Sequence, residues 1–224
     1  MPQLEICCYS YTSALHASSG GANRIELCAP GSGGLTPDRQ TIVHCRSLND
    51  IALFIMIRPR AGNFCYTQEE FEEMKENIRM AKLLGADGVV FGILNPDYTV
   101  DVARNTELAR LAYPMYATFH KAFDLCRDLE KALDDCVDCG MHRILTSGGQ
   151  ATALSGFAAI SHLVSYANDR IILIAGGGVR ASNINALHIP GLSEYHSSAI
   201  LSGTDADLTE IQGLRRRIDS FSTK

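Results

Sequence analysis

Apolar and polar residues alternate along several short stretches of the chain, which is the pattern of a β-strand that buries one face. In residues 4–10 the polar face carries Glu5 and Cys7, and a second stretch later in the chain places Glu26 and Cys28 together in the same way. A buried carboxylate is costly unless it is paired. Two carboxyl groups in register therefore predict a polar pocket and not a plain hydrophobic core.

Strand-like runs of this kind alternate with helical patterns over the whole chain. The strands are predicted at residues 4–10, 24–28, 51–57, 88–94, 116–120, 143–146, 171–175 and 194–198. The helices are predicted at residues 12–19, 38–47, 67–84, 100–112, 129–139, 153–167 and 207–221, with a short helix that opens at residue 182. Eight repeats in 224 residues predict an α/β protein that is a single-domain (β/α)8 barrel of the TIM type, spanning residues 1–224. The alternative is a doubly wound open sheet. That fold binds ligand at one switch point and would not need polar residues late in nearly every strand.

Composition narrows the class of protein further. The chain is 46% hydrophobic and 20% charged, with a net charge of −5 and with acids and bases interspersed. This balance does not favour nucleic acid or an anionic membrane as a partner. The sequence has no secretory hydrophobic segment and no run of the roughly 18 apolar residues that a spanning helix needs. We therefore expect a cytoplasmic protein.

Eight cysteines raise the question of disulfides or a structural metal. In a protein of this length without a secretory signal, we expect most of them to be free thiols. Cys136 and Cys139 have the C-x-x-C spacing, but they stand alone and fall inside a predicted helix instead of at its start. Packing thiols are the favoured interpretation of this pair.

Polar side chains gather late in the predicted strands, which is where the site of a TIM barrel lies. We take five of them as candidate catalytic residues: Glu5, Glu26, Arg58, His120 and His196. His120 is the preferred acid or base, and a neighbouring glutamate could orient it. By alternation, Lys121 faces the helices, so a Schiff base at this lysine is not expected. The alternative is a charge-balanced polar plug that fills the barrel and has only a structural role.

Glycine-rich turns follow the sixth and seventh predicted strands, and a pair of serines follows the eighth. Their exposed backbone N–H groups predict an anion site, with phosphate as a plausible occupant. The candidate substrate-binding residues are Arg60, Ser147, Gly148, Gly177, Gly178 and Ser197. Together with the acid–base candidates, they raise the hypothesis of a barrel enzyme that acts on a small phosphorylated or carboxylated metabolite.

Cys7 and Cys28 are the candidate metal ligands. They occupy matching positions on adjacent parallel strands, whose backbones lie about 4.8 Å apart. Soft thiolates select Cu(I) or zinc. The alternative is that both are small core hydrophobes, as many buried cysteines are.

Several long motifs together resemble the copper homeostasis protein CutC family. They are Leu4-Glu5-Ile6-Cys7, Arg24-Ile25-Glu26-Leu27-Cys28, Gly33-Gly34-Leu35-Thr36-Pro37, Ile57-Arg58-Pro59-Arg60, Thr118-Phe119-His120, Ala122-Phe123-Asp124, Arg143-Ile144-Leu145-Thr146-Ser147-Gly148 and Glu194-Tyr195-His196-Ser197-Ser198. The resemblance implies a cytoplasmic (β/α)8 barrel that handles copper ions, with Cys7 and Cys28 at the positions of the family's proposed copper ligands. It implies no established reaction, and it leaves a homo-oligomer possible.

Three departures from the family pattern stand out. Lys121 replaces an arginine and so loses a bidentate fork, Asn63 removes a carboxylate from the rim, and the loop after Ser198 is short.

Overall fold

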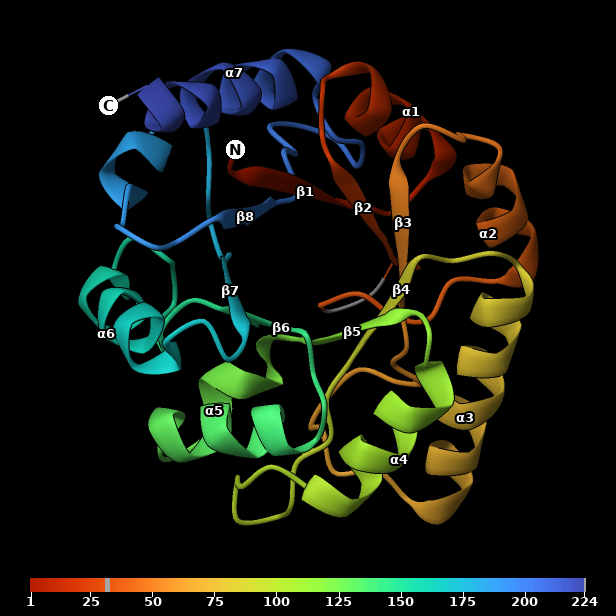
Figure 1. Ribbon diagram of the computed structural model, residues 1–224. Coiled ribbons are helices and arrows are strands. Elements are labelled where there is room, and N and C mark those ends of the chain that lie inside the picture. The colour runs from red at the N-terminus through yellow and green to blue at the C-terminus, as the bar shows by residue number, and fades with distance from the viewer. Residues whose placement is uncertain (31–32, 224) are drawn as a thin grey trace.

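Eight parallel strands close into a barrel in the order β1 to β8, with helices around the outside (Figure 1). The structure is a computed structural model, and it describes residues 1–30 and 33–223. The strands are β1 Gln3–Cys8, β2 Arg24–Leu27, β3 Ala52–Met56, β4 Gly88–Phe91, β5 Tyr116–Phe119, β6 Arg143–Thr146, β7 Ile172–Ala175 and β8 Glu194–Ser197. The predicted single (β/α)8 barrel is therefore confirmed, and the open sheet is excluded, because β1 pairs with both β2 and β8.

The outer layer consists of helices that follow the strands in turn. They are α1 Tyr11–Ser19, α2 Arg39–Arg46, α3 Gln68–Leu83, α4 Val102–Ala112, α5 Leu129–Asp138, α6 Phe157–Ala167 and α7 Leu208–Asp219, with short 3-10 helices η1 Lys121–Leu125, η2 Ile184–Leu187 and η3 Ser220–Thr223. Thr67 and Glu70 form the capping box that begins α3. The turn predicted from residue 182 is the 3-10 helix η2.

Two buried apolar clusters divide the interior. The larger one lies between the strands and the helices and includes Leu4, Ile6 and Cys8, the face of β1 that alternation assigns to it. The smaller one fills part of the barrel and contains Cys7, Cys28, Phe54, Met56 and Val90. On β1 and β2, the side chains that face into the barrel are therefore those of the polar face, as the alternation of these two strands predicts.

Strand register decides which polar residues become neighbours. In the parallel ladder, Cys7 lies opposite Glu26 of β2, and Glu5 lies opposite His196 of β8. Two consecutive strands, β1 and β2, and the distant strand β8 thus bring acids, a thiol and an imidazole to one side of the barrel.

Candidate functional site

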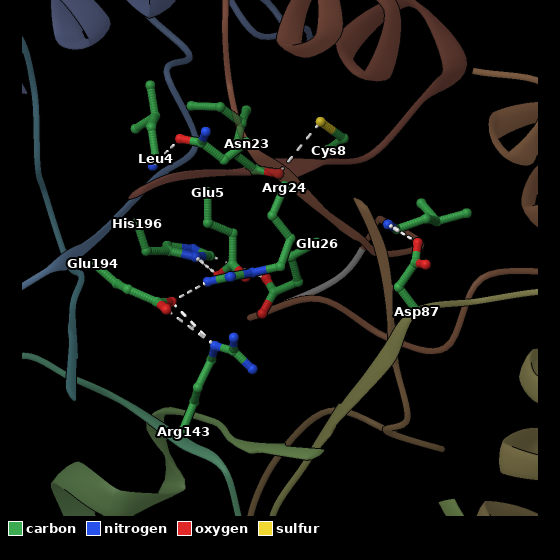
Figure 2. Close-up of polar contacts among 12 residues, drawn as sticks. Leu4, Glu5, Cys8, Asn23, Arg24, Glu26, Asp87, Arg143, Glu194 and His196 are labelled. Atoms are coloured by element: carbon green, nitrogen blue, oxygen red, sulfur yellow. Dashed lines mark hydrogen bonds and ion pairs between the residues drawn. The ribbon is translucent and has the colours of Figure 1, made fainter. Parts of the chain in front are cut away.

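A buried ionic network fills the barrel below its mouth. Arg24 forms ion pairs with Glu5 and with Glu194, the latter at 2.5 Å from Nη2 to Oε2. Arg143 pairs with Glu194 at 3.2 Å, and the guanidinium groups of Arg24 and Arg143 both stack on the ring of Phe54. Figure 2 shows these charged side chains converging from β1, β2, β6 and β8. The barrel therefore contains a polar plug, but its cations are Arg24 and Arg143, whereas Arg58 lines the cavity and Arg60 pairs with Glu70.

Glu5 belongs to this plug and does not line the cavity above it. Its Oε2 accepts from Arg24, and its Oε1 lies 2.6 Å from Nδ1 of His196. Burial raises the pKa of Glu5, but the charges and hydrogen bonds of Arg24 and His196 outweigh it and hold the pKa at about 2. Glu5 is therefore a fixed anion that orients His196, a role that the sequence analysis gave to a glutamate beside His120.

A cavity of about 310 Å³ lies above the plug, at the carboxyl ends of the strands. Its lining residues come from six strands or the loops that follow them: Cys7, Tyr9, Glu26, Gly33, Met56, Arg58, Phe64, His120, Lys121, Leu145 and His196. Four of the five candidate catalytic residues meet here, and Glu5 lies below. The location is the one where TIM barrels bind their ligands.

The wall formed by β8, β1 and β2 carries soft and acidic groups. The Sγ atoms of Cys7 and Cys28 lie 3.8 Å apart and share a hydrogen bond, and Cys28 donates to Oε2 of Glu26 at 3.6 Å. Nε2 of His196 lies 3.9 Å from the same carboxyl. One ligand atom each from Cys7, Glu26 and His196 falls within 4.8 Å of the others, which is a spacing that could hold a metal ion.

The thiols of Cys7 and Cys28 differ in pKa. The hydrogen bond with Cys28 lowers the pKa of Cys7 well below its ordinary value, and His196 adds to this effect against the cost of burial. The same hydrogen bond and burial raise the pKa of Cys28 well above its ordinary value. Burial disfavours the imidazolium of His196, but Glu26, Cys7 and Glu5 together raise its pKa. The arrangement therefore favours a thiolate at Cys7 beside an imidazolium at His196.

Glu26 is unusual among the acids of the site. Burial, together with the negative charge of Cys7, raises the pKa of its carboxyl well above the ordinary value. Its Oε1 is buried and has no hydrogen-bond partner among the described residues. A buried oxygen of this kind is a natural contact for a ligand.

The wall formed by the ends of β3 and β5 carries donors and cations. Arg58 is buried, with Nη1 donating to the carbonyl of Gly34 and Nη2 to that of Gly62, and its guanidinium lies over the ring of Phe64. Nδ1 of His120 accepts the N–H of Ala122. Burial and the charge of Arg58 lower the pKa of His120 to about 3, so its imidazole is neutral and carries its proton on Nε2.

The prediction that Lys121 faces the helices is wrong. Strand alternation ends at Phe119, and Lys121 begins the 3-10 helix η1, so its side chain turns into the cavity. Its Nζ lies 2.6 Å from Oγ of Ser147 and 3.1 Å from Oδ2 of Asp124. Gly177 makes room for it, because a Cβ at that position would lie 3.1 Å from Nζ.

Asp124, which was quoted only within a family motif and was not a candidate site residue, occupies the turn that follows β6. Its carboxylate accepts from the N–H groups of Ser147 and Gly149, from Oγ of Ser147 and from Oγ1 of Thr146. The N–H of Gly148 donates to Oγ1 of Thr146. In the turn after β6, the N–H groups predicted to hold an external anion are thus bound by the protein itself. The only hint in the sequence was an acid placed shortly after a strand end.

The remaining candidate substrate-binding residues lie outside the cavity lining. Arg60 pairs with Glu70 at the start of α3. Ser197 donates to the carbonyl of Val179 and accepts from Arg180, and Gly178 packs near Thr152. Their predicted role in substrate binding stays a prediction, and the structure gives Arg60 a structural contact instead.

All eight cysteines are free thiols, as expected for most of them. Cys136 is buried in α5 and Cys139 caps its C-terminus, which agrees with packing thiols. Among the described residues, no helix combines the length and the apolar character needed to cross a membrane.

Fold and site together define a (β/α)8-barrel protein whose mouth combines a carboxyl, two imidazoles and a thiol, with a second thiol buried beside the first. The chain belongs to the CutC family, because the family model matches residues 2–201.

Similar proteins from two bacteria support this assignment. A family protein CutC from Klebsiella pneumoniae (strain 342) is 46% identical over 200 residues, which cover 89% of this chain and 81% of that protein. One from Chromobacterium violaceum is 45% identical over 198 residues, with 88% and 80% covered.

Solved structures agree with the fold. A crystal structure from Streptococcus agalactiae, which carries the name copper homeostasis protein CutC, superposes with a TM-score of 0.84 at 32% identity and covers 88% of this chain and 99% of that one. The thiamine phosphate pyrophosphorylase of Pyrococcus furiosus, at 14% identity and a TM-score of 0.67 over 98% of this chain and 96% of that one, shares the fold alone.

Proposed function

We propose that this chain is a cytoplasmic copper-homeostasis protein that binds Cu(I) between the thiolates of Cys7 and Cys28. The observation that carries the proposal is the 3.8 Å separation of the two Sγ atoms, of which Cys7 lines the cavity and Cys28 is buried beside it. Thiolates are the soft ligands that Cu(I) prefers. The name of the Streptococcus agalactiae relative, copper homeostasis protein, points to the same cargo.

The donor set fits a soft ion of low coordination number. With thiolate–metal bonds of about 2.3 Å, as for zinc, two sulfurs lie about 3.8 Å apart at a tetrahedral angle and about 4.6 Å apart in a linear arrangement. The observed separation supports a bent arrangement, which leaves room for a third ligand. His196 and Glu26 are the residues within reach.

The surroundings of His196 support its part in this set. A histidine that ligates a metal commonly donates its other ring N–H to a carboxylate, which fixes its orientation. Glu5 stands in this position beside Nδ1 of His196, and Nε2 is turned toward Glu26. Binding would release the proton of Cys28, because only thiolates ligate the ion, and would also release the Nε2 proton of His196 if that ring serves as the third ligand.

An anaerobic Cu(I) titration against a chromophoric competing chelator tests the proposal. Cys7→Ser and Cys28→Ser should each lose the tight site, whereas Cys136→Ser should keep it. Cys136 is the matched control because it is equally buried but lies in α5, outside the cavity lining. Wild-type affinity in both Cys7→Ser and Cys28→Ser would contradict the assignment.

A further inference from the structure

One wall of the cavity has no part in binding a soft cation. It consists of Arg58, His120 and Lys121, which come from the ends of β3 and β5. Two of these side chains are cations, and a cation wall repels copper. These residues therefore suit a ligand other than copper.

His120 supplies the first observation. Its side chain is buried and lines the cavity, and its Nε2 has no hydrogen-bond partner among the described residues. Because Nδ1 accepts the N–H of Ala122, the neutral ring offers Nε2–H as a donor. Leaving a buried donor without an acceptor is unfavourable, so the ligand for this wall has an acceptor atom at that place.

The neighbouring charges give the sign of the ligand. Arg58 and His120 both contact the ring of Phe64, with the guanidinium carbon 4.7 Å and the imidazole centroid 4.8 Å from the centre of that ring. Lys121 pairs with Asp124, but its side chain is about 40% exposed and also lines the cavity. An acceptor that meets a neutral N–H between two cations is best supplied by an anion.

The turn after β6 decides which anion fits. TIM barrels commonly hold phosphate on backbone N–H groups of late loops and on a helix N-terminus. Here Asp124 fills that turn, with Ser147 and Gly149 donating to it. The N-cap of α6, Gly156, packs against the carbonyl of Ser147. What remains in the cavity is a small number of side-chain donors, which suits a carboxylate with two oxygens better than a phosphate with three.

The rest of the lining describes the body of the ligand. Met56, Phe64 and Leu145 supply apolar surface beside the donor wall. A cavity of about 310 Å³ lies at the lower end of the roughly 300–1,000 Å³ of small-molecule sites. A short hydrocarbon chain fits this space.

We propose that the cavity binds a small aliphatic carboxylate, with the carboxylate on Nε2–H of His120 between Arg58 and Lys121 and with the hydrocarbon chain against Met56 and Leu145. This inference goes beyond copper binding and uses other residues of the cavity. Copper binding and carboxylate binding can therefore fail separately.

The test is ligand-observed NMR titration of the full-length protein with butyrate, n-butylamine and inorganic phosphate as probes. Butyrate should bind saturably, and n-butylamine, which has the same chain and the opposite charge, should not. Phosphate binding stronger than butyrate binding, or no saturable binding of butyrate, overturns the proposal.

Two variants locate the site. His120→Asn keeps an oxygen that accepts the N–H of Ala122, as a good cap residue does, but it removes the donor at Nε2. It should weaken butyrate binding about tenfold or more, as expected for a hydrogen bond to a charged group. Lys121→Met should weaken it as well.

The matched control is Lys131→Met, which removes a lysine of α5 that pairs with Asp135 outside the cavity. It should bind butyrate as the wild type does. Equal butyrate affinity in wild type, His120→Asn and Lys121→Met also overturns the proposal.

Discussion

Glu5 holds two partners with one side chain. Replacing it by glutamine leaves the charge of Arg24 buried with less compensation and weakens the contact with Nδ1 of His196. Removing one partner of a buried ion pair costs about 3–5 kcal/mol. We expect Glu5→Gln to lower the free energy of unfolding by this amount, measured by urea denaturation at pH 7.

Glu107→Gln is the control for this prediction. Glu107 pairs with Lys75 across an exposed contact between α4 and α3, and such pairs contribute about 0–1 kcal/mol. Similar losses in the two variants would show that the buried network has no special weight in stability.

Single residues also mark where sequence reasoning ends. Alternation along β1 and β2 correctly assigned Cys7, Glu26 and Cys28 to the interior, because period two is a property of the strand itself. It was wrong for Lys121, because the strand ends before that residue. Arg24 was visible on the face of Glu26, but its pairing with Glu194 depends on a side chain that lies 170 residues away.

At the level of elements, the backbone at Gly34, between β2 and α2, passes very close to Cys28. Gly34 has φ +79°, and a Cβ at this position would lie 2.8 Å from Sγ and 3.1 Å from Cβ of Cys28. The side chain of an alanine here would therefore push Cys28 out of its place beside Cys7. A glycine at Gly34 is needed for backbone conformation and for space at once.

We expect Gly34→Ala to weaken Cu(I) binding by on the order of tenfold, or about 1.4 kcal/mol, because it displaces one of the two thiols. The measurement is the anaerobic chelator competition used for the cysteine variants.

Gly140→Ala is the matched control for Gly34→Ala. Gly140 has φ +78°, almost the same as Gly34, but a Cβ there meets no atom within 4 Å. Both variants should lose about 1–2 kcal/mol of folding stability from backbone strain. Only Gly34→Ala should lose copper affinity, and an equal loss in both would remove the steric argument.

Elements were the most predictable level of this structure. All eight strands and seven helices lie where periodicity and end signals place them, because local physics decides them. The anion-binding turn after β6 was predicted from its glycines alone. The sequence could not reveal that Asp124 of η1 would fill it, since that contact joins two elements through the fold.

For the molecule as a whole, the plug makes stability depend on acid. The folded pKa of Glu5 is about 2, below its ordinary value of 4.5, so its contribution is complete above pH 4.5 and is lost as the pH falls toward 2. A shift of this size corresponds to on the order of 3 kcal/mol. Glu26 acts in the opposite sense, because its pKa is raised in the folded state. Its contribution to stability is complete below pH 4.5 and is lost as the pH rises above that value.

Urea midpoints measured between pH 6 and pH 2 check this expectation. The free energy of unfolding of Glu5→Gln should fall less steeply below pH 4.5 than that of the wild type. Parallel curves for the two proteins would mean that Glu5 does not carry the acid sensitivity.

The barrel as a whole was predictable because eight repeats and their spacing leave few other folds. The division of the barrel interior into a plug and a cavity was not predictable, because it depends on which charged side chains meet across the barrel. Arg58 and Arg143 are both arginines near strands, yet one lines the cavity and the other belongs to the plug.

The plug determines from which end of the barrel a ligand can reach the cavity. Because Arg24, Glu194, Arg143 and Phe54 close the barrel beneath the cavity, the described residues leave access from the carboxyl ends of the strands. If the cavity carries a copper ion as proposed, a molecule that delivers the ion and a molecule that collects it would have to use this same opening, one after the other.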